Sequence, residues 1–190
     1  MNRRTFVSSL CAGGAAYLVA PLPFAQTMKT PALARPLEQI RTDWKSLAPA
    51  NASIVFAPTP ADKRSNAEWK KTLGREAYHV LRDDGTEPPG SSPLNNEKRR
   101  GIYACAGCGL ALFTSEMKFD SGTGWPSFFT VIPGHFATKR DFKLILPRTE
   151  YHCIRCEGHH GHLFNDGPKP TGERWCNNGV ALRFVPSESA

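Results

Sequence analysis

The sequence predicts a mainly β domain built from short antiparallel strands. Its 190 residues include 16 glycines and 16 prolines, and these residues favour a fold with many turns over a helical bundle. From residue 101 onward, short apolar or alternating runs are separated by such turn residues, a pattern typical of antiparallel sheets. The length suffices for one hydrophobic core and a tail. We therefore expect a single folded domain at residues 61–186.

The composition argues against a nucleic-acid partner. Hydrophobic residues make up 40% of the chain and charged residues 22%, both ordinary values for a globular protein. The formal net charge is +7, but the basic residues are scattered and form no patch of the kind that binds phosphate backbones.

The first 25 residues resemble an export signal. Arg3 and Arg4 precede an apolar run of small residues that begins at Phe6, which is the layout of a secretory signal. The paired arginines followed by Phe6 are similar to a twin-arginine signal. We expect a periplasmic or otherwise extracytoplasmic protein that contacts a membrane only through this segment. An uncleaved membrane anchor is the alternative, although the run is short for a bilayer.

Residues 26–60 are rich in Pro, Ala and Thr, and we interpret them as a linker. One short amphipathic helix is expected there, with Ile40, Trp44 and Leu47 on its apolar face. The domain then opens with a helix over residues 65–74, because Ser65 and Glu68 form a typical capping pair. A second short helix is expected at 75–81, and a polar loop at 83–100.

The remaining elements are predicted to be strands. Their expected ranges are 101–105, 111–114, 128–132, 141–146, 149–153, 162–165 and 180–185.

Two Cys-x-x-Cys pairs predict a structural zinc site. The pairs are Cys105 with Cys108 and Cys153 with Cys156. A two-residue gap lets a tight turn direct both sulfurs at one ion, and two such pairs complete a tetrahedral shell of four thiolates. Two disulfides are the alternative in an exported protein, and a thioredoxin-like redox pair is a third. Twin-arginine export carries folded proteins, so metal loading in the cytoplasm is compatible with export.

The segment after the second pair carries the candidate chemistry. Three histidines (His159, His160 and His162) are followed by a Gly/Pro-rich turn and by Cys176 in the run Arg-Trp-Cys-Asn-Asn. Cys176 is the odd thiol left over once the two pairs and Cys11 of the signal segment are set aside. A lone cysteine is otherwise often an inert buried residue.

Four stretches, together with the cysteine pairs, resemble the B-type methionine-R-sulfoxide reductases from about residue 65 to 185. They read FDSGTGWPSF at 119–128, EGHHGHLF at 157–164, DGPKPTG at 166–172 and ERWCNN at 173–178. The resemblance implies a small all-β domain of two antiparallel sheets with an N-terminal helix. In zinc-bearing members, the metal ties loops together far from the catalytic centre.

The resemblance implies that Cys176 is the nucleophile. A thiolate attacks the sulfoxide sulfur and becomes a sulfenic acid as methionine is released. If this segment is a strand, Arg174 and Asn178 share its face with Cys176, and we expect a cation and an amide donor there to favour the thiolate.

The other site residues are expected to bind and protonate the sulfoxide. His159 and His162 are spaced to direct both rings into one cleft, where imidazoles supply the proton for the oxygen. The alternative is that one of them is a metal ligand. Trp125 presents a flat wall to the methyl group on sulfur, and Phe128 either extends that wall or packs in the core. His160 is expected at the surface.

One departure from the family touches the mechanism. Many members carry a resolving cysteine between the two glycines of the Gly-Trp-Pro stretch, and Thr123 stands there in this chain. The expected partners are therefore oxidised proteins or peptides as substrates and a thioredoxin-like or other thiol reductant that acts directly on Cys176. The alternative function is a zinc-held β binding module without catalysis, in which no thiol is unusually reactive.

Overall fold

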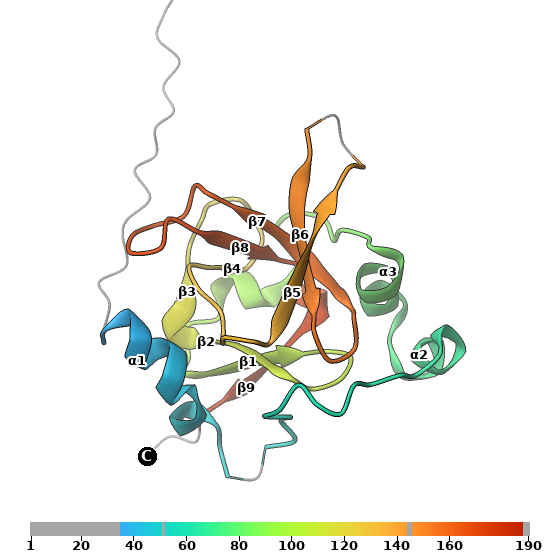
Figure 1. Cartoon of the computed structure of the whole chain (residues 1–190), viewed down its shortest axis with the longest axis horizontal. Helices are drawn as coiled ribbons and strands as arrows, with labels where there is room; N and C mark the ends of the chain where they lie inside the picture. The colour runs from blue at the N-terminus through green and yellow to red at the C-terminus, as the bar shows by residue number, and fades with distance from the viewer. Residues whose placement is uncertain (1–34, 51, 144–145, 188–190) are drawn as a thin grey trace, which may run out of the picture.

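Two antiparallel sheets form the body of the protein (Figure 1). The computed structural model describes residues 35–50, 52–143 and 146–187. One sheet has three strands in the order β2-β1-β9, and the other has six in the order β3-β4-β8-β7-β6-β5. The predicted fold class, mainly β with two antiparallel sheets and few helices, is confirmed.

The strands are short, as expected. Their bounds are β1 Gly101–Cys105, β2 Ala111–Thr114, β3 Lys118–Phe119, β4 Ser127–Phe128, β5 Phe136–Asp141, β6 Arg148–Cys153, β7 His159–Phe164, β8 Arg174–Asn177 and β9 Leu182–Pro186. The helices are α1 Leu37–Thr42, α2 Asn66–Thr72 and α3 Arg75–Asp83, with 3-10 turns η1 Asp43–Leu47, η2 Pro93–Asn96, η3 Ser115–Met117 and η4 Gly179–Ala181.

Two strand predictions need correction. The strand expected at 141–146 is β5, which occupies Phe136–Asp141 and pairs along its whole length with β6. Its sequence, FATKRD, is too polar for a pattern search, and the pairing with its neighbour defines it. The strand expected at 128–132 is shorter, because β4 has only two residues. Strand β8 carries Cys176, and it is absent from the predicted strand ranges, although the residues around Cys176 were considered as a possible strand.

Aromatic side chains from both sheets fill the space between them. Phe113 of β2 stacks on Phe128 of β4 with ring centroids 3.9 Å apart, and Tyr103 of β1 meets the same ring edge-on at 5.0 Å. All three side chains are fully buried. Offset and edge-to-face pairs of this kind add to the free energy of apolar burial, so these rings hold the two sheets face to face.

The described part of the expected linker packs on the domain. The predicted helix is confirmed as α1 and η1, and Ile40, Trp44 and Leu47 are buried in the core. Further along, Val55 forms a parallel bridge with Leu110. The linker interpretation is therefore wrong for these residues, because their apolar side chains complete the core that the short strands leave open.

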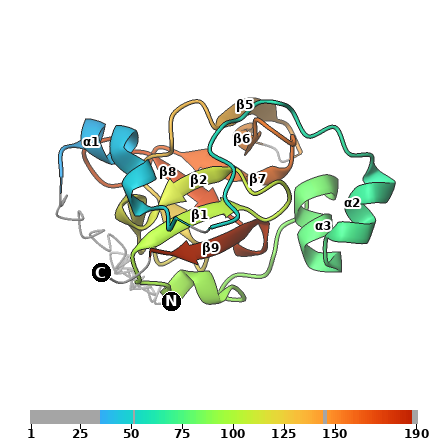
Figure 2. The same ribbon diagram turned by 90° about the horizontal axis from the view of Figure 1, so that it is seen from below.

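Helices α2 and α3 lie at the opposite end of the sheets from α1 (Figure 2). The predicted capping pair is present: the Ser65 hydroxyl accepts a hydrogen bond from the Glu68 N–H, and the Glu68 carboxylate accepts one from the Ser65 N–H. Trp69 of α2 is buried near Gly107, and Leu81 of α3 lies against Gly158. The helices thus cover the two turns that carry the paired cysteines.

No helix among residues 35–50, 52–143 and 146–187 combines the length and apolarity needed to span a bilayer. The predicted export signal at residues 1–25, with Cys11, lies outside the described residues.

Candidate active site and metal centre

Strands β7 and β8 bring Cys176 and His162 together. The two residues are direct partners in the antiparallel ladder, and Ser127 of β4 faces Cys176 from its other side. The close approach depends on Gly161, because a Cβ at that position would lie 1.9 Å from the carbonyl oxygen of Cys176. A glycine next to the histidine is therefore a steric requirement of this pairing.

A small cavity of about 120 Å³ opens beside this pair. It is lined by Thr86, Trp125, Arg148, Gly161, His162, Phe164, Cys176, Asn177 and Asn178. Four residues that the sequence nominated for the site, namely Trp125, His162, Cys176 and Asn178, therefore meet at one cavity. Thiol, imidazole, amide and indole groups line its wall together.

Burial and the neighbouring Arg174 have opposite effects on the pKa of the Cys176 thiol. Burial raises the pKa of its thiol, and the neighbouring Arg174 guanidinium and the Thr123 hydroxyl offset this only in part. Arg174 is already engaged, because its Nε and Nη2 donate to the two carboxylate oxygens of Asp166 at 2.8 and 2.9 Å. Arg174 therefore favours the thiolate, as expected, but burial outweighs its effect, and the pKa of the Cys176 thiol in the free protein lies above its usual value.

His162 is fixed by a buried carboxylate. Its Nε2 lies 2.7 Å from Asp141 Oδ2, and Asp141 also accepts hydrogen bonds from the Arg148 side chain at 2.7 Å and from the Lys143 N–H at 2.8 Å. The Lys143 N–H, the imidazole and Arg148 together hold the pKa of Asp141 well below its usual value. Because an ionised carboxylate only accepts hydrogen bonds, Nε2 of His162 carries the proton.

The second nominated histidine lies behind the first. The ring of His159 is 5.5 Å from that of His162 and meets it edge-on, but His159 is buried and does not line the cavity. Its Nδ1 lies 3.0 Å from Glu150 Oε1. Only the ring of His162 lines the cavity, although the β-bulge in the β6–β7 ladder pairs His159 with His152 and so keeps it on the same side of the strand as His162.

Two further expectations are corrected by burial. Phe128 is fully buried and stacks on Phe113, so it packs in the core and is no part of the substrate wall. His160, expected at the surface, is also fully buried, and burial lowers the pKa of its imidazole to about 3. Both side chains point to the inter-sheet side of strands that the sequence pattern alone did not orient.

Glu87 is a structural residue of the site that sequence reasoning missed. Its carboxylate accepts hydrogen bonds from the N–H groups of Gly179 and Val180, and its own N–H donates to Asn178 Oδ1 at 3.0 Å. Its carbonyl accepts the indole N–H of Trp125 at 3.1 Å. Glu87 thus positions both the Asn178 amide and the Trp125 indole. Its partners lie 38 to 93 residues further along the chain, so no local pattern identifies it.

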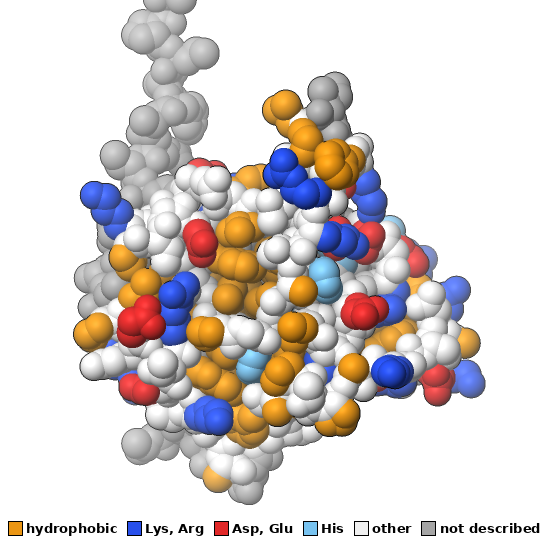
Figure 3. Space-filling view, viewed as in Figure 1, with side chains coloured by type: hydrophobic (Ala, Val, Ile, Leu, Met, Phe, Trp, Pro, Cys, Tyr) orange, Lys and Arg blue, Asp and Glu red, His pale blue; other side chains and the backbone are white. Residues whose placement is uncertain are grey.

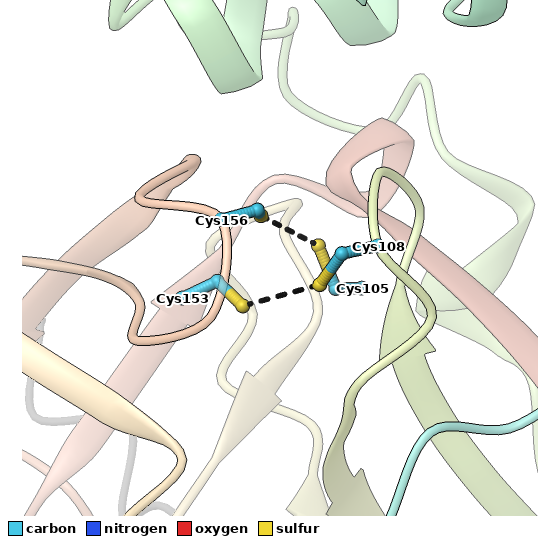
Figure 4. Close-up of side chains that lie close together, drawn as sticks. All are labelled: Cys105, Cys108, Cys153 and Cys156. Carbon is cyan, nitrogen blue, oxygen red and sulfur yellow. Dashed lines mark hydrogen bonds between the residues drawn. The ribbon is translucent and has the colours of Figure 1, made fainter. Parts of the chain in front are cut away.

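The four paired cysteines form a second centre (Figure 4). Cys105 and Cys108 lie in the β1–β2 turn of the three-stranded sheet, and Cys153 and Cys156 in the β6–β7 turn of the six-stranded sheet. Their sulfurs approach to 3.7 Å for Cys105 with Cys156 and 3.6 Å for Cys108 with Cys153. A tetrahedral Zn–S shell requires edges of about 3.8 Å, whereas a disulfide requires ~2.05 Å. The thiols are free and buried, and their arrangement fits zinc.

Basic side chains surround this cluster. Arg155 donates to the Cys108 carbonyl at 3.2 Å and Arg82 to the Cys156 carbonyl at 2.8 Å. The guanidinium of Arg64 stacks on Trp69 beside them, 3.6 Å from the ring centroid. Four thiolates around a divalent ion would carry a net negative charge, which these guanidinium groups would partly compensate, although Arg64 and Arg155 also pair with Asp62. Neither His159 nor His162 belongs to this cluster, although His159 lies with Asp84 and Glu150 in a second group whose ligand atoms are close enough to hold a metal ion.

The chain is similar to a known family and to several characterised relatives. Residues 73–186 match the SelR domain. The "Peptide methionine sulfoxide reductase MsrB" of Methanosarcina barkeri is 50% identical over 129 residues, covering 67% of this chain and 91% of the relative. The protein of the same name from Agrobacterium fabrum is 46% identical, covering 67% and 96%. Among solved structures, the Mis18 "Yippee-like" domain reaches a TM-score of only 0.38 at 14% identity, covering 48% of this chain and 100% of that domain.

The four-cysteine cluster predicts one zinc ion per chain. Replacement of a ligand, Cys105→Ser, is expected to abolish stoichiometric zinc in elemental analysis. It should also lower the unfolding temperature by roughly 6–12 °C or more, because losing about 3 kcal/mol or more of metal-linked stability shifts Tm by ~2–4 °C per kcal/mol. Cys176→Ser is the matched control and should retain the metal. Native protein with two disulfides and no zinc by mass spectrometry would contradict the assignment.

Proposed function

The chain belongs to the SelR domain family and is an oxidoreductase that reduces methionine sulfoxide, and from this premise we propose that it repairs the R epimer, mainly in peptides, through Cys176. The observation that carries the proposal is the direct pairing of Cys176 with His162 beside a cavity walled by Trp125. The family membership sets aside the alternative of a binding module without catalysis.

The first step moves one proton and one oxygen atom. The neutral Cys176 thiol passes its proton to Nδ1 of His162, which is free to accept because Nε2 donates to Asp141. Asp141 stabilises the resulting imidazolium. The thiolate attacks the sulfoxide sulfur, and His162 delivers the proton to the sulfoxide oxygen. The oxygen remains on Cys176 as a sulfenic acid, so Cys176 is oxidised by two electrons and the substrate sulfur is reduced by two.

The supporting residues orient this exchange. Trp125 contacts the methyl group on sulfur, and its indole is held by the Glu87 carbonyl. Arg174 lies near the developing thiolate, and Asn178, fixed by Glu87 and by the carbonyl of His160, forms the cavity wall beside it. With the methyl group against Trp125 and the oxygen at His162, only one configuration at sulfur presents its lone pair and chain correctly. In this proposal, that arrangement is the source of selectivity between the two epimers.

The metal has a separate role. Cys105, Cys108, Cys153 and Cys156 would hold a zinc ion, which would supply folding stability and no chemistry, because four thiolate ligands would leave no position for a substrate. His159, paired with Glu150, acts from behind His162 as a structural support for the imidazole.

Turnover on the two separated epimers of a methionine sulfoxide peptide tests the proposal. We expect reduction of the R epimer only, and a peptide should be a better substrate than the free amino acid. Cys176→Ser should reduce turnover to the uncatalysed level, because a hydroxyl is a far weaker nucleophile and forms no sulfenic acid. Near-normal activity of the serine variant, or a preference for the S epimer, would refute the assignment.

Recycling of Cys176 depends on an external thiol, because Thr123 offers none. Its hydroxyl lies within reach of the Cys176 thiol and donates or accepts a hydrogen bond with Ser121 at 2.8 Å. Two thiols of a thioredoxin-like or other reductant are oxidised to a disulfide as the sulfenic acid returns to a thiol and releases water.

Reduced enzyme mixed with excess substrate and no reductant should therefore form one methionine per chain and leave a dimedone-reactive Cys176. The matched variant is Thr123→Cys. Because this side chain neighbours Cys176, the variant should trap the sulfenic acid as an intramolecular disulfide and lose dimedone reactivity. Spontaneous disulfide formation to Cys176 in the unmodified chain would show that one of the assigned metal ligands is the resolving thiol.

We propose that the protein acts outside the cytoplasm and that residues 1–25 are a twin-arginine export signal. The support is the pair Arg3 and Arg4 ahead of an apolar run. Substitution of both arginines by lysine should retain the protein in the cytoplasm, as measured by cell fractionation. Export that is unchanged by this substitution, but lost when residues 6–19 are made polar, would indicate the general secretory route.

A further inference from the structure

The β5–β6 hairpin extends beyond the rest of its sheet, next to the candidate active site (Figure 1). Asp141 and Arg148 are the last paired residues of the two strands, and they form an ion pair at 2.7 Å. The same Asp141 binds His162. The projecting end of the hairpin is therefore anchored to the histidine of the site through a buried carboxylate.

Apolar side chains are exposed immediately beyond this anchor. Phe142 is 71% exposed and Leu146 is 78% exposed, which are the highest values among the large apolar residues of the described chain; Phe56 and Ile154 follow at 40% and 42%. Hydrophobic atoms gather at the end of this hairpin, with basic side chains below them (Figure 3). Two large apolar side chains exposed on one hairpin indicate an interaction site more strongly than isolated ones do.

A groove runs along the same hairpin. It has a volume of about 720 Å³, and its apolar wall includes Leu146, Pro147, Leu163 and Phe164. Arg148 and Phe164 line both this groove and the active-site cavity. The groove and the cavity therefore share a wall, so a chain that placed one side chain in the cavity would continue into the groove.

We propose that this groove, with Phe142 exposed on the same hairpin, binds the apolar residues that flank an oxidised methionine in an extended segment of a substrate protein. The inference rests on the proposed function and specifies its substrate class. The cavity of about 120 Å³ holds little more than the sulfoxide end of one side chain, so the flanking residues must lie outside it. The surface they meet is apolar and continuous with the cavity. Apolar neighbours of methionine are buried in folded proteins, so the favoured substrates are unfolded or partly unfolded chains.

The charged residues along the groove predict a second preference for the sequence around the oxidised methionine. Arg140 lines the groove, and Lys143 lies on the same hairpin, where it pairs with Asp84 at 3.2 Å. Arg140 is exposed and none of the described acidic groups forms an ion pair with it. A free guanidinium at the rim of the groove disfavours basic residues close to the oxidised methionine.

The test compares two acetylated, amidated peptides that carry R-methionine sulfoxide between two leucines or between two serines. N-acetylmethionine sulfoxide serves as the reference substrate. In the double variant Phe142→Ser/Leu146→Ser, the ratio of kcat/KM for the leucine peptide to that for the reference is expected to fall about tenfold, the effect of losing roughly 55 Å² of apolar contact. The serine peptide should show no comparable fall. Phe56→Ser removes a similarly apolar exposed side chain elsewhere and should leave both ratios unchanged.

An unchanged leucine ratio in the double variant, or an equal fall in Phe56→Ser, would overturn the proposal. Fluorescence anisotropy of the same peptides, labelled and bound to Cys176→Ser protein, gives a second readout that needs no turnover. Preferential binding of the leucine peptide that is lost in the double variant supports the groove, and equal binding of both peptides contradicts it. Wild-type protein that reduces none of the three substrates would refute the proposed function, and the anisotropy result would still decide on the groove.

Discussion

The structure depends on the meeting of two hairpin turns, one from each sheet, at four buried sulfurs. The β1–β2 turn brings Cys105 and Cys108, and the β6–β7 turn brings Cys153 and Cys156. Strands of two to six residues bury too little surface individually to fix the position of one sheet on the other. A metal at this point would help the aromatic core to fix the position of the two sheets relative to each other. It would also set the start of β7, and hence the register that places His162 opposite Cys176.

Burial sets the protonation states of Cys176 and His162. Burial raises the pKa of Cys176 and lowers that of His162, so both side chains are neutral in the resting protein. If either side chain were exposed to solvent, an ion pair between the Cys176 thiolate and the His162 imidazolium would form more readily. In the proposed mechanism, Asp141, which binds both Arg148 and His162, stabilises the imidazolium when that ion forms.

Local patterns predicted the fold class, the capped helix at Ser65 and the cysteine pairs, and the family resemblance nominated four residues that line the cavity. They failed where long-range pairing decides the outcome. Strand β5 is polar and exists through its ladder with β6, and Glu87 acts on backbone groups of a distant segment. His160 and Phe128 were misplaced because adjacent residues of a strand face opposite sides, and the β-bulge beside His159 shifts which of them faces the core.

The metal centre and the redox chemistry of Cys176 constrain each other. A protein with five cysteines in its described residues would ordinarily offer several thiols to a sulfenic acid. Here four of them are buried together at the junction of the sheets, and ligation would hold them as thiolates that are unavailable for exchange. In the proposed mechanism, the oxidised sulfur of Cys176 then has no internal partner among the described residues, because Thr123 stands near it and the other four cysteines are held together. On that proposal, the four-cysteine cluster that joins the sheets also makes recycling depend on an external thiol, which reaches the cavity after the methionine has left.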